Sequence, residues 1–329
     1  MKYLILGSNS FSGGSFIKYC LDHEKDASIF AVSRCDEYHS SLLAYKNHKL
    51  SSSVKFFKLD LNNDIDKIVE IIARERIDYI INFAAQGMVA QSWDEPLHWI
   101  NTNVTAIVNL VHKIYKFDFI KKFVQISTPE VYGSCVNQQE SMCFAPSSPY
   151  AASKASADLF LYSFYNTMQF PVNFTRAANV YGAYQQLYRI IPKTILSIKK
   201  NTKLHLQGGG KAVRSFIHID DVSSATLKIA KDAKSGEIFH ISDTKSISIY
   251  DLVNLICKEM DVRMSDFVEI VDDRKSQDSV YLMDNTKLIN ELGYTPKCKL
   301  KEGIREVIKW IDDNYDYLKD TPDYYIHKA

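Results

Sequence analysis

The chain has 329 residues, which at about 150 residues per domain leaves room for about two domains and a sizeable buried core. Forty lysines and arginines balance 39 aspartates and glutamates, so no bulk field attracts nucleic acid or an anionic membrane. With 46% hydrophobic and 24% charged residues, the composition excludes a disordered chain. Any anionic ligand must therefore be bound by a few placed groups.

The cysteines and the first residues bear on the compartment. The six cysteines are scattered, without a C-x-x-C pair or a spacing that suits a metal, so we expect neither a disulfide framework nor a metal site. Met1 is followed almost at once by an apolar strand, which leaves no place for a secretory signal, and no apolar run is long enough to span a bilayer. We expect a cytoplasmic enzyme or binding protein without nucleic-acid or membrane partners.

The first half of the chain alternates short apolar runs with longer amphipathic stretches, which is the pattern of βαβ units. Strands are predicted at residues 2–6, 28–32, 54–59, 79–83, 122–126 and 172–176. The main helices are predicted at residues 16–21, 64–76, 96–115 and 150–167. Six strands with intervening helices predict a doubly wound parallel sheet, whose ligands bind beyond the carboxyl ends of the strands.

The second half of the chain is less regular. After Tyr181 and Gly182 the predicted elements become shorter, and the chain is rich in helices from Ser248 onward. We predict a larger domain from residues 1–180 with about 216–245, and a smaller α/β domain from 181–215 with 246–329. Because no linker separates the two, they should share a cleft. The last stretch, 312–329, is rich in Tyr, Asp and Lys and contains no motif.

A glycine turn joins the first predicted strand to its helix, between Gly7 and Gly14. Such a turn lets the backbone approach a pyrophosphate, and the helix N-terminus offers free N–H groups to it. Ser10 stands where a middle glycine would give the closest approach, so an ordinary strand-to-helix turn stays open as the alternative. The position of Gly7 directly after a continuous apolar strand favours a dinucleotide site.

The residues after the second and third strands bear on the choice of dinucleotide. Ser33 and Arg34 suit the 2′-phosphate of NADP, whereas an acidic residue directly after this strand would bind the ribose hydroxyls of NAD. We therefore favour NADP, and NAD is the alternative because Asp36 follows two residues later. Asp60, at the end of the third strand, is either an adenine contact or a helix cap.

Tyr150 and Lys154 stand four residues apart and so lie on one face of a predicted helix. The lysine charge favours the phenolate, which can then take a proton from a sugar or alcohol hydroxyl. A lone Y-x-x-x-K pair is common. Here the preceding strand also ends in Ser127 and Thr128, which places hydroxyls at the carboxyl end of a central strand, where catalytic groups of such sheets lie.

Seven short motifs follow one another along almost the whole chain. They are Gly7–Gly13, Asn82–Gln86, Asn103-Val104, Ser127–Gly133, Tyr150–Lys154, Asn179–Gly182 and Arg214–Asp221. In this order they resemble the extended short-chain dehydrogenase/reductase family, in particular its nucleotide-sugar epimerases and its GDP-mannose and dTDP-glucose 4,6-dehydratases. The resemblance implies a Rossmann domain with tightly bound NAD(P) and a smaller domain that binds the nucleotide sugar. It also implies a homodimer, or a tetramer, formed through the helices at 96–115 and 150–167.

The resemblance also implies roles for individual residues. Thr128 would bond the sugar O4, Tyr150 would be the base for the C4 hydroxyl, and Lys154 would bond the nicotinamide ribose. Glu130 falls where the dehydratases, unlike the simple epimerases, carry a glutamate that removes the C5 proton. The other cofactor contacts would be Gly7, Ser10, Phe11, Gly13, Arg34, Asp60, Leu61, Ala84, Ala85 and Asn103. The substrate contacts would be Gln86, Ser92, Asn179, Arg189, Arg214 and Arg274.

One residue departs from the family pattern. Many dTDP-glucose dehydratases carry an aspartate between the threonine and the glutamate, but Pro129 stands there and has no proton to donate. GDP-mannose dehydratases also lack the aspartate, and their arginine after the second strand matches Arg34. Our hypothesis is that Glu130 acts first as base and then as acid. We favour a 4,6-dehydratase over a 4-epimerase, a UDP-glucuronate decarboxylase and a non-catalytic NAD(P)-binding protein.

Overall fold

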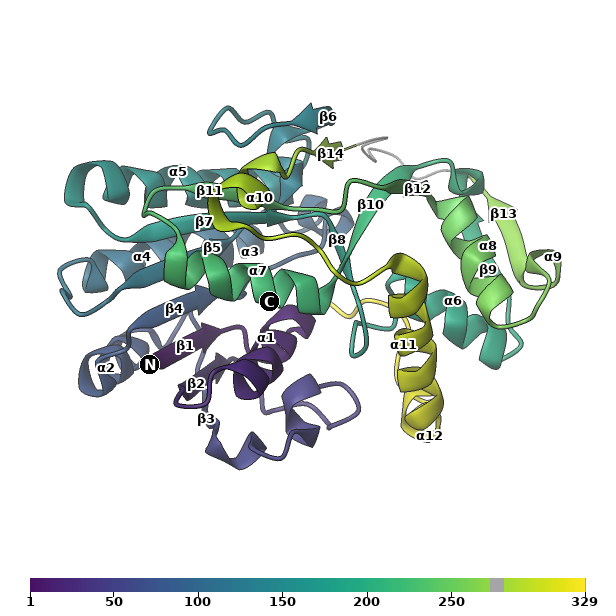
Figure 1. Cartoon of the computed structure of the whole chain (residues 1–329), viewed down its shortest axis with the longest axis horizontal. Helices are drawn as coiled ribbons and strands as arrows, with labels where there is room; N and C mark the ends of the chain where they lie inside the picture. The colour runs from purple at the N-terminus through teal and green to yellow at the C-terminus, as the bar shows by residue number, and fades with distance from the viewer. Residues whose placement is uncertain (273–280, 329) are drawn as a thin grey trace.

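A computed structural model describes residues 1–272 and 281–328, so the predicted substrate contact Arg274 lies outside the described residues. A seven-stranded parallel sheet forms the centre of a larger lobe (Figure 1), in the order β11-β7-β5-β4-β1-β2-β3. Its strands are β1 Lys2–Leu6, β2 Ser28–Ser33, β3 Lys55–Lys58, β4 Tyr79–Asn82, β5 Lys122–Ile126, β7 Val172–Ala177 and β11 Ile238–Ile241. The predicted doubly wound α/β class is confirmed, with β11 as a seventh strand that the sequence pattern did not predict.

Helices cover both faces of this sheet. On one face α1 packs beside α7, and Phe16, Ile17 and Leu227 enter the core between them and the strands. On the other face lie α2, α4 and α5, whose core positions are filled mainly by isoleucine and leucine. The bounds are α1 Phe11–His23, α2 Ile65–Glu75, α4 Ala106–Ile114, α5 Pro149–Met168 and α7 Ile219–Asp232.

The helix predicted at 96–115 is one helical run with a wider turn inside it. It consists of α3 (Pro96–Ile100), a π-helical turn at Asn101–Thr105 and then α4. The π turn carries Asn103, which is 1% exposed. Its Oδ1 accepts a hydrogen bond from the Gln86 N–H at 2.8 Å, and its Nδ2 donates to the Ser153 Oγ at 2.9 Å. The turn therefore ties this helix to the loop after β4 and to α5.

A smaller lobe stands at the right in Figure 1. Its helices α6, α8 and α11 enclose a core that includes Ile191, Leu252, Ile304 and Trp310. The elements are α6 Ile190–Lys199, α8 Ile249–Glu259, α9 Met264–Phe267, α11 Leu300–Asp313, α12 Tyr315–Leu318, β9 Leu204–Gln207 and β13 Val268–Val271.

Short strands run between the two lobes. A three-stranded sheet has the order β12-β10-β8, and β14 pairs with β6, while α10 packs on β11 of the large sheet. Their bounds are β6 Cys135–Gln138, β8 Asn179–Tyr181, β10 Val213–His218, β12 Ser246–Ser248, β14 Tyr281–Met283 and α10 Thr286–Leu292. The chain thus crosses between the lobes several times, which holds the cleft between them in place.

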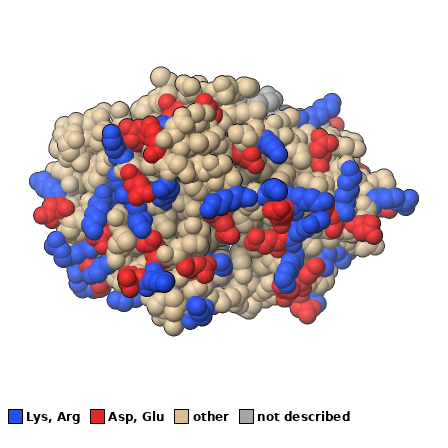
Figure 2. All heavy atoms as spheres, in the orientation of Figure 1, with Lys and Arg blue, Asp and Glu red and all other residues tan. Residues whose placement is uncertain are grey.

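The surface agrees with the balanced composition. On the face seen in Figure 2, positive and negative side chains are interspersed rather than gathered by sign. Among the described helices, none combines the length and the apolar character that a bilayer span requires.

Candidate active site

One large cavity, with a volume of about 1890 Å³, opens between the lobes at the carboxyl ends of the central strands. Residues that follow β1, β2, β3, β4, β5 and β7 all line it, as the Rossmann arrangement predicts. Pockets for a single drug-sized ligand have volumes of about 300–1,000 Å³. The cavity therefore has room for two extended ligands side by side.

The glycine turn after β1 packs tightly against the neighbouring strand. Gly7 has φ +79°, and a Cβ atom there would lie 2.6 Å from the Ala84 nitrogen. A Cβ on Gly13 would lie 2.4 Å from the Gly7 carbonyl oxygen. Both positions therefore require glycine, because a side chain would push α1 away from the end of β4 and widen the turn.

Ser10 is part of this turn rather than a defect in it. It is the N-cap of α1: its Oγ accepts a hydrogen bond from the Gly13 N–H at 3.0 Å and donates one to the Gly7 carbonyl at 2.7 Å. Serine is among the favoured N-cap residues because it satisfies one of the free N–H groups at the helix start. The remaining first-turn N–H groups and the positive end of the helix dipole stay directed to the cavity edge, which suits an anion.

The predicted cofactor residues divide into two groups. Most line the cavity in a continuous path from the glycine turn across the ends of β2, β3 and β4: Gly7, Ser10, Phe11, Arg34, Asp60, Leu61, Ala84 and Ala85. Gly13 and Asn103 do not line it; Gly13 shapes the turn, and Asn103 braces the backbone of Gln86. An elongated path with an anion site at its middle fits a dinucleotide.

Thr128 and Glu130 lie on one tight turn directly after β5. Thr128 is the N-cap of a 3₁₀ turn at Pro129–Tyr132, and its Oγ1 accepts from the Glu130 N–H at 3.3 Å. Pro129 occupies the first helical position, which its fixed φ favours. Both Thr128 and Glu130 line the cavity. The sequence therefore places a hydroxyl and a carboxylate on the same rigid turn.

Tyr150 and Lys154 face the same cavity from the start of α5. This helix begins in the same way, because Ser148 is its N-cap, with Oγ accepting from the Ala151 N–H at 3.2 Å, and Pro149 follows. Lys154 is 3% exposed, and its ammonium donates to the Ile126 carbonyl at 2.7 Å. Burial lowers the pKa of Lys154 to about 8, an effect that the Asp158 carboxylate opposes.

Behind these groups lies a buried ion pair that the sequence analysis missed. Arg176 and Asp158 are both fully buried and 3.0 Å apart, and the Asp158 carboxylate also accepts the Ser127 hydroxyl at 2.6 Å. A lone arginine within an otherwise uncharged strand was the only signal in the sequence. Because removal of one partner would leave an uncompensated buried charge, the pair is tightly constrained. It fixes the residue that precedes Thr128.

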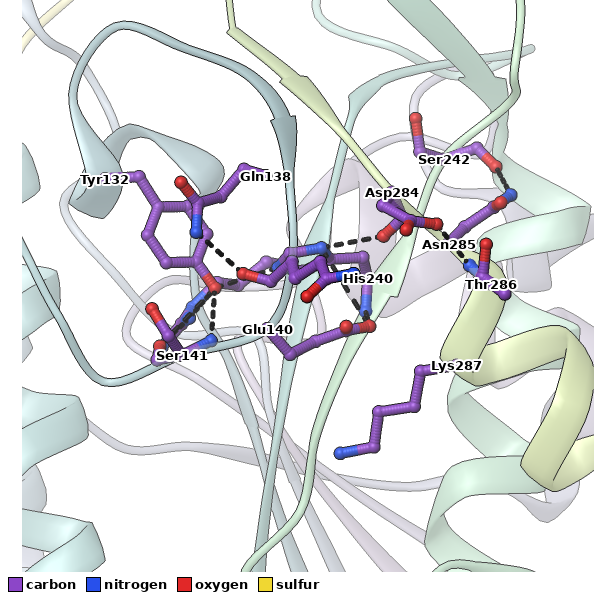
Figure 3. A network of polar contacts seen from close by, with 12 residues as sticks. Tyr132, Gln138, Glu140, Ser141, His240, Ser242, Asp284, Asn285, Thr286 and Lys287 are labelled. Atoms are coloured by element: carbon purple, nitrogen blue, oxygen red, sulfur yellow. Dashed lines mark hydrogen bonds and ion pairs between the residues drawn. The ribbon is translucent and has the colours of Figure 1, made fainter.

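The same arginine contacts a second network, of which Figure 3 shows Tyr132, His240 and Asp284. Arg176 donates to the Tyr132 hydroxyl, which bonds His240 Nε2 at 2.8 Å, while His240 Nδ1 lies 2.9 Å from the Asp284 carbonyl. Burial lowers the pKa of His240 to about 4, so the ring is neutral at pH 7 and accepts from the tyrosine. Tyr132 closes the turn that carries Glu130, so this network holds the turn against β11 and β14.

The predicted substrate residues are distributed unevenly. Gln86, Asn179, Arg189 and Arg214 line the cavity. Ser92 does not: it is fully buried, and its hydroxyl donates to the Val89 carbonyl at 2.6 Å. The structure therefore brings four of the five described substrate candidates together at one cleft.

The cavity is also lined by residues that no motif indicated. These come from the end of the described chain: Thr321, Pro322, Tyr324, Tyr325, Ile326 and Lys328. The Gln86 side-chain amide donates to the Lys328 carbonyl at 2.7 Å. The stretch that contained no motif thus contributes to the cleft.

The chain is similar in sequence to known proteins over most of its length. The chain matches the family model described as GDP-mannose 4,6 dehydratase over residues 4–307. It is 32% identical over 327 residues to dTDP-D-glucose 4,6-dehydratase of Bos taurus, an alignment that covers 97% of this chain and 91% of the relative.

Two solved structures show that the fold alone does not distinguish a dehydratase from an epimerase. The dTDP-glucose 4,6-dehydratase DesIV of Streptomyces venezuelae, solved with NAD bound, has a TM-score of 0.87 at 28% identity and covers 96% of this chain and 98% of its own. A UDP-glucose 4-epimerase of Thermotoga maritima has a TM-score of 0.85 at 24% identity, with 96% of this chain and 100% of its own covered. Dehydratase and epimerase therefore share this fold, and the side chains of the cleft must separate them.

Proposed function

The chain belongs to the GDP-mannose 4,6-dehydratase family, as a nucleotide-sugar 4,6-dehydratase, and we propose that Thr128, Glu130, Tyr150 and Lys154 carry out its reaction. The observation that carries this assignment is the position of Glu130, because a carboxylate on the Thr128 turn faces the same cavity as Tyr150 and Lys154. An epimerase has no step that needs such an acid. The reaction converts a nucleoside diphosphate hexose into the 4-keto-6-deoxy hexose and water.

In the first step the C4 hydroxyl of the sugar loses its proton to the Tyr150 phenolate. Thr128 Oγ1 bonds the sugar O4 and orients it. The buried ammonium of Lys154, next to the phenol along the helix, favours the phenolate electrostatically. When bound, a nicotinamide dinucleotide supplies reversible storage of a hydride, which these side chains lack. The C4 carbon is then a ketone.

In the second step Glu130 acts on C5. The C4 ketone makes the C5 proton acidic, and the Glu130 carboxylate takes it. Glu130 then donates the same proton to the C6 hydroxyl, which leaves as water. Glu130 must be this acid because Pro129 has no proton to donate. C6 then receives the hydride that C4 gave up in the first step, and C5 takes a proton from solvent, so a single carboxylate serves as base and then as acid.

We assign the two ligands to the two lobes. The larger lobe, residues 1–180 with about 216–245, would bind the dinucleotide along the glycine turn and the ends of β2 to β4. The smaller lobe, 181–215 with 246–329, would bind the nucleotide sugar. Arg189 and Arg214 line the cavity on that side, and their planar guanidinium groups suit a diphosphate.

The dinucleotide is of the nicotinamide type, and we propose NADP as the preferred one. Arg34 lines the cavity at the end of β2, where a 2′-phosphate would lie. Asp36, the residue that would favour NAD, is instead paired with Lys58 at 2.7 Å with its side chain 83% exposed. The NAD bound to the Streptomyces relative supports NAD as the alternative. Identifying the dinucleotide that heat denaturation releases from the purified protein separates the two.

A homodimer through α3 and α5 accounts for an exposed apolar surface. These two helices pack side by side, and each carries large apolar side chains in solvent. Leu97 is 68% exposed on α3, and Leu159 and Phe160 are 50% and 49% exposed on α5. Large exposed apolar side chains on two neighbouring helices suit a protein interface. We propose that a second copy of the chain covers it.

Incubation with GDP-, dTDP-, UDP- and CDP-hexoses tests the proposed function. Mass spectrometry should detect loss of one water from one of these substrates and so identify the base. If none loses water while a C4 epimer accumulates, the chain is an epimerase and Glu130 is incidental. A UDP-hexuronate is incubated in the same way. If it loses carbon dioxide, the chain is a decarboxylase.

The rate should fall as the pH rises through about 8. Lys154 titrates there in the free enzyme, and its neutral form no longer favours the phenolate. Below that pH the lysine is charged, so its titration does not change the rate any further. The measurement is the pH profile of kcat/KM. In the variant Lys154→Arg the cation stays charged, because a guanidinium has a pKa above about 12, so the alkaline limb should move upward. An unmoved limb would assign it to another group.

A further inference from the structure

Residues 321–328 form an extended segment that returns from the smaller lobe to the larger one. In Figure 1 it leaves α12 and runs to the C label beside the larger lobe. Its residues alternate in exposure: the even-numbered ones are exposed, and the odd-numbered ones are half-buried. Tyr324, for example, is 63% exposed. One face of the segment therefore lies against the protein, as in an edge strand.

The inward face is anchored to both lobes. The His327 ring stacks on the buried Trp99 ring of α3, with centroids 5.2 Å apart and planes 7° apart. His327 Nε2 lies 2.9 Å from Nδ1 of His98, also on α3. Tyr325 bonds His327 Nδ1 through its hydroxyl at 3.2 Å and meets the Tyr188 ring of the smaller lobe edge-on at 5.7 Å. The segment is therefore fixed to both lobes by specific side-chain contacts.

The backbone carbonyl of Lys328, the last described residue, lies between two residues predicted to bind ligands. The Lys328 carbonyl accepts from Gln86 Nε2 at 2.7 Å and from an Arg34 guanidinium nitrogen at 3.0 Å. Arg34 follows β2 and Gln86 follows β4, so this carbonyl bridges the dinucleotide side of the cavity. The Lys328 ammonium lies 5.7 Å from the centre of the Tyr38 ring.

The segment borders the cavity without filling it. The volume of about 1890 Å³ is what remains with the segment in place, and Tyr325 and Lys328 are among its lining residues. That volume exceeds the range of about 300–1,000 Å³ for one drug-sized ligand. A plug that competed with the ligands would leave less room than this, so the observations favour a wall.

We propose that residues 321–328 are an integral wall of the dinucleotide site and that His327 is the positioning residue that keeps this wall closed. This inference rests on the proposed function in one respect, the binding of a nicotinamide dinucleotide in the cavity. With His327 seated on Trp99, the Lys328 carbonyl holds Arg34 and Gln86 at the cavity edge. Release of the dinucleotide then requires the segment to detach, which keeps the cofactor bound through successive turnovers.

Displacement of bound NADH or NADPH by an excess of the oxidised form measures this directly through the fluorescence decay. In the full chain with His327→Ala, the dissociation rate should rise about tenfold, since one ring stack and one hydrogen bond are lost. A chain ended after Asp320 should release at least as fast. His327→Phe keeps the ring and should restore part of the slow release. The matched control His23→Ala removes a histidine ring that stacks on Tyr19 at the end of α1, outside the cavity lining, and should release at the parent rate.

Equal release rates in the parent, His327→Ala and the shortened chain would overturn the proposal. Tighter binding by the shortened chain would also overturn it, because it would identify the segment as a competitor for the site. The readout is independent of turnover. If the parent protein retains its dinucleotide but dehydrates no nucleotide hexose, only the proposed function is wrong. If the protein is a dehydratase and its release rate does not depend on His327, only this inference is wrong.

Discussion

Replacement of Glu130 by glutamine should lower turnover by a factor on the order of 10²–10⁴, the range typical of a lost general base. Glutamine has the shape of glutamate but takes up no proton, so the reaction should stop after oxidation at C4. Dinucleotide binding should be unchanged, because the carboxylate lies at the Thr128 turn and not on the glycine turn. Exchange of the C5 hydrogen in deuterium oxide, followed by mass spectrometry, should be lost while the 4-keto hexose still forms.

A matched control for this variant is Glu95→Gln. Glu95 is an exposed glutamate at the start of α3 and does not line the cavity, so the same change of charge there should leave turnover intact. Unchanged turnover in Glu130→Gln would contradict the dehydratase mechanism. Loss of both the 4-keto hexose and the exchange would instead place Glu130 at the first step.

Replacement of Tyr150 by phenylalanine should abolish the first step itself, with a loss of turnover again on the order of 10²–10⁴-fold. Without the phenol no group takes the proton from the C4 hydroxyl, so neither the 4-keto hexose nor C5 exchange should appear. The two variants therefore block the reaction at different points. Rapid-quench mass spectrometry of a single turnover distinguishes them, because only Glu130→Gln should accumulate the 4-keto hexose.

Tyr162→Phe is the control for this second variant. Tyr162 lies on the same helix, α5, but its ring packs against Phe174 in the core rather than at the cavity. Loss of that hydroxyl should leave the rate of the first step at its parent value. If Tyr150→Phe still oxidises C4 at the parent rate, the proton passes to another group and the assignment of the base is wrong.

The inner strands of the central sheet could be predicted because they are buried on both faces. The apolar runs at 2–6 and 122–126 coincide with β1 and β5 at both ends. The edge strand β11 escaped prediction because it has four residues, one of them His240, and its place is decided by pairing with β7. So short and mixed a run has no periodicity that separates it from a loop.

The turn that we propose to be catalytic could be predicted from motifs, whereas its supports could not. Thr128, Glu130, Tyr150 and Lys154 stand in short local patterns and converge on one cavity. The partners that hold them are set by tertiary contacts between distant positions. Ser127 meets Asp158 across 31 positions of the chain, and Tyr132 meets His240 across 108. A local pattern carries no information about such pairs.

The π turn at Asn101–Thr105 sets the rotational phase of α3 relative to α4. Because each residue of an α-helix advances the chain by about 100° around the axis, one residue fewer in this turn would rotate α3 by that angle. His98 and Trp99 would then face away from His327, even though no residue of the anchor had changed. An insertion or deletion in this turn would therefore act on residues 321–328 as a change of angle, through the Trp99 ring on which His327 stacks.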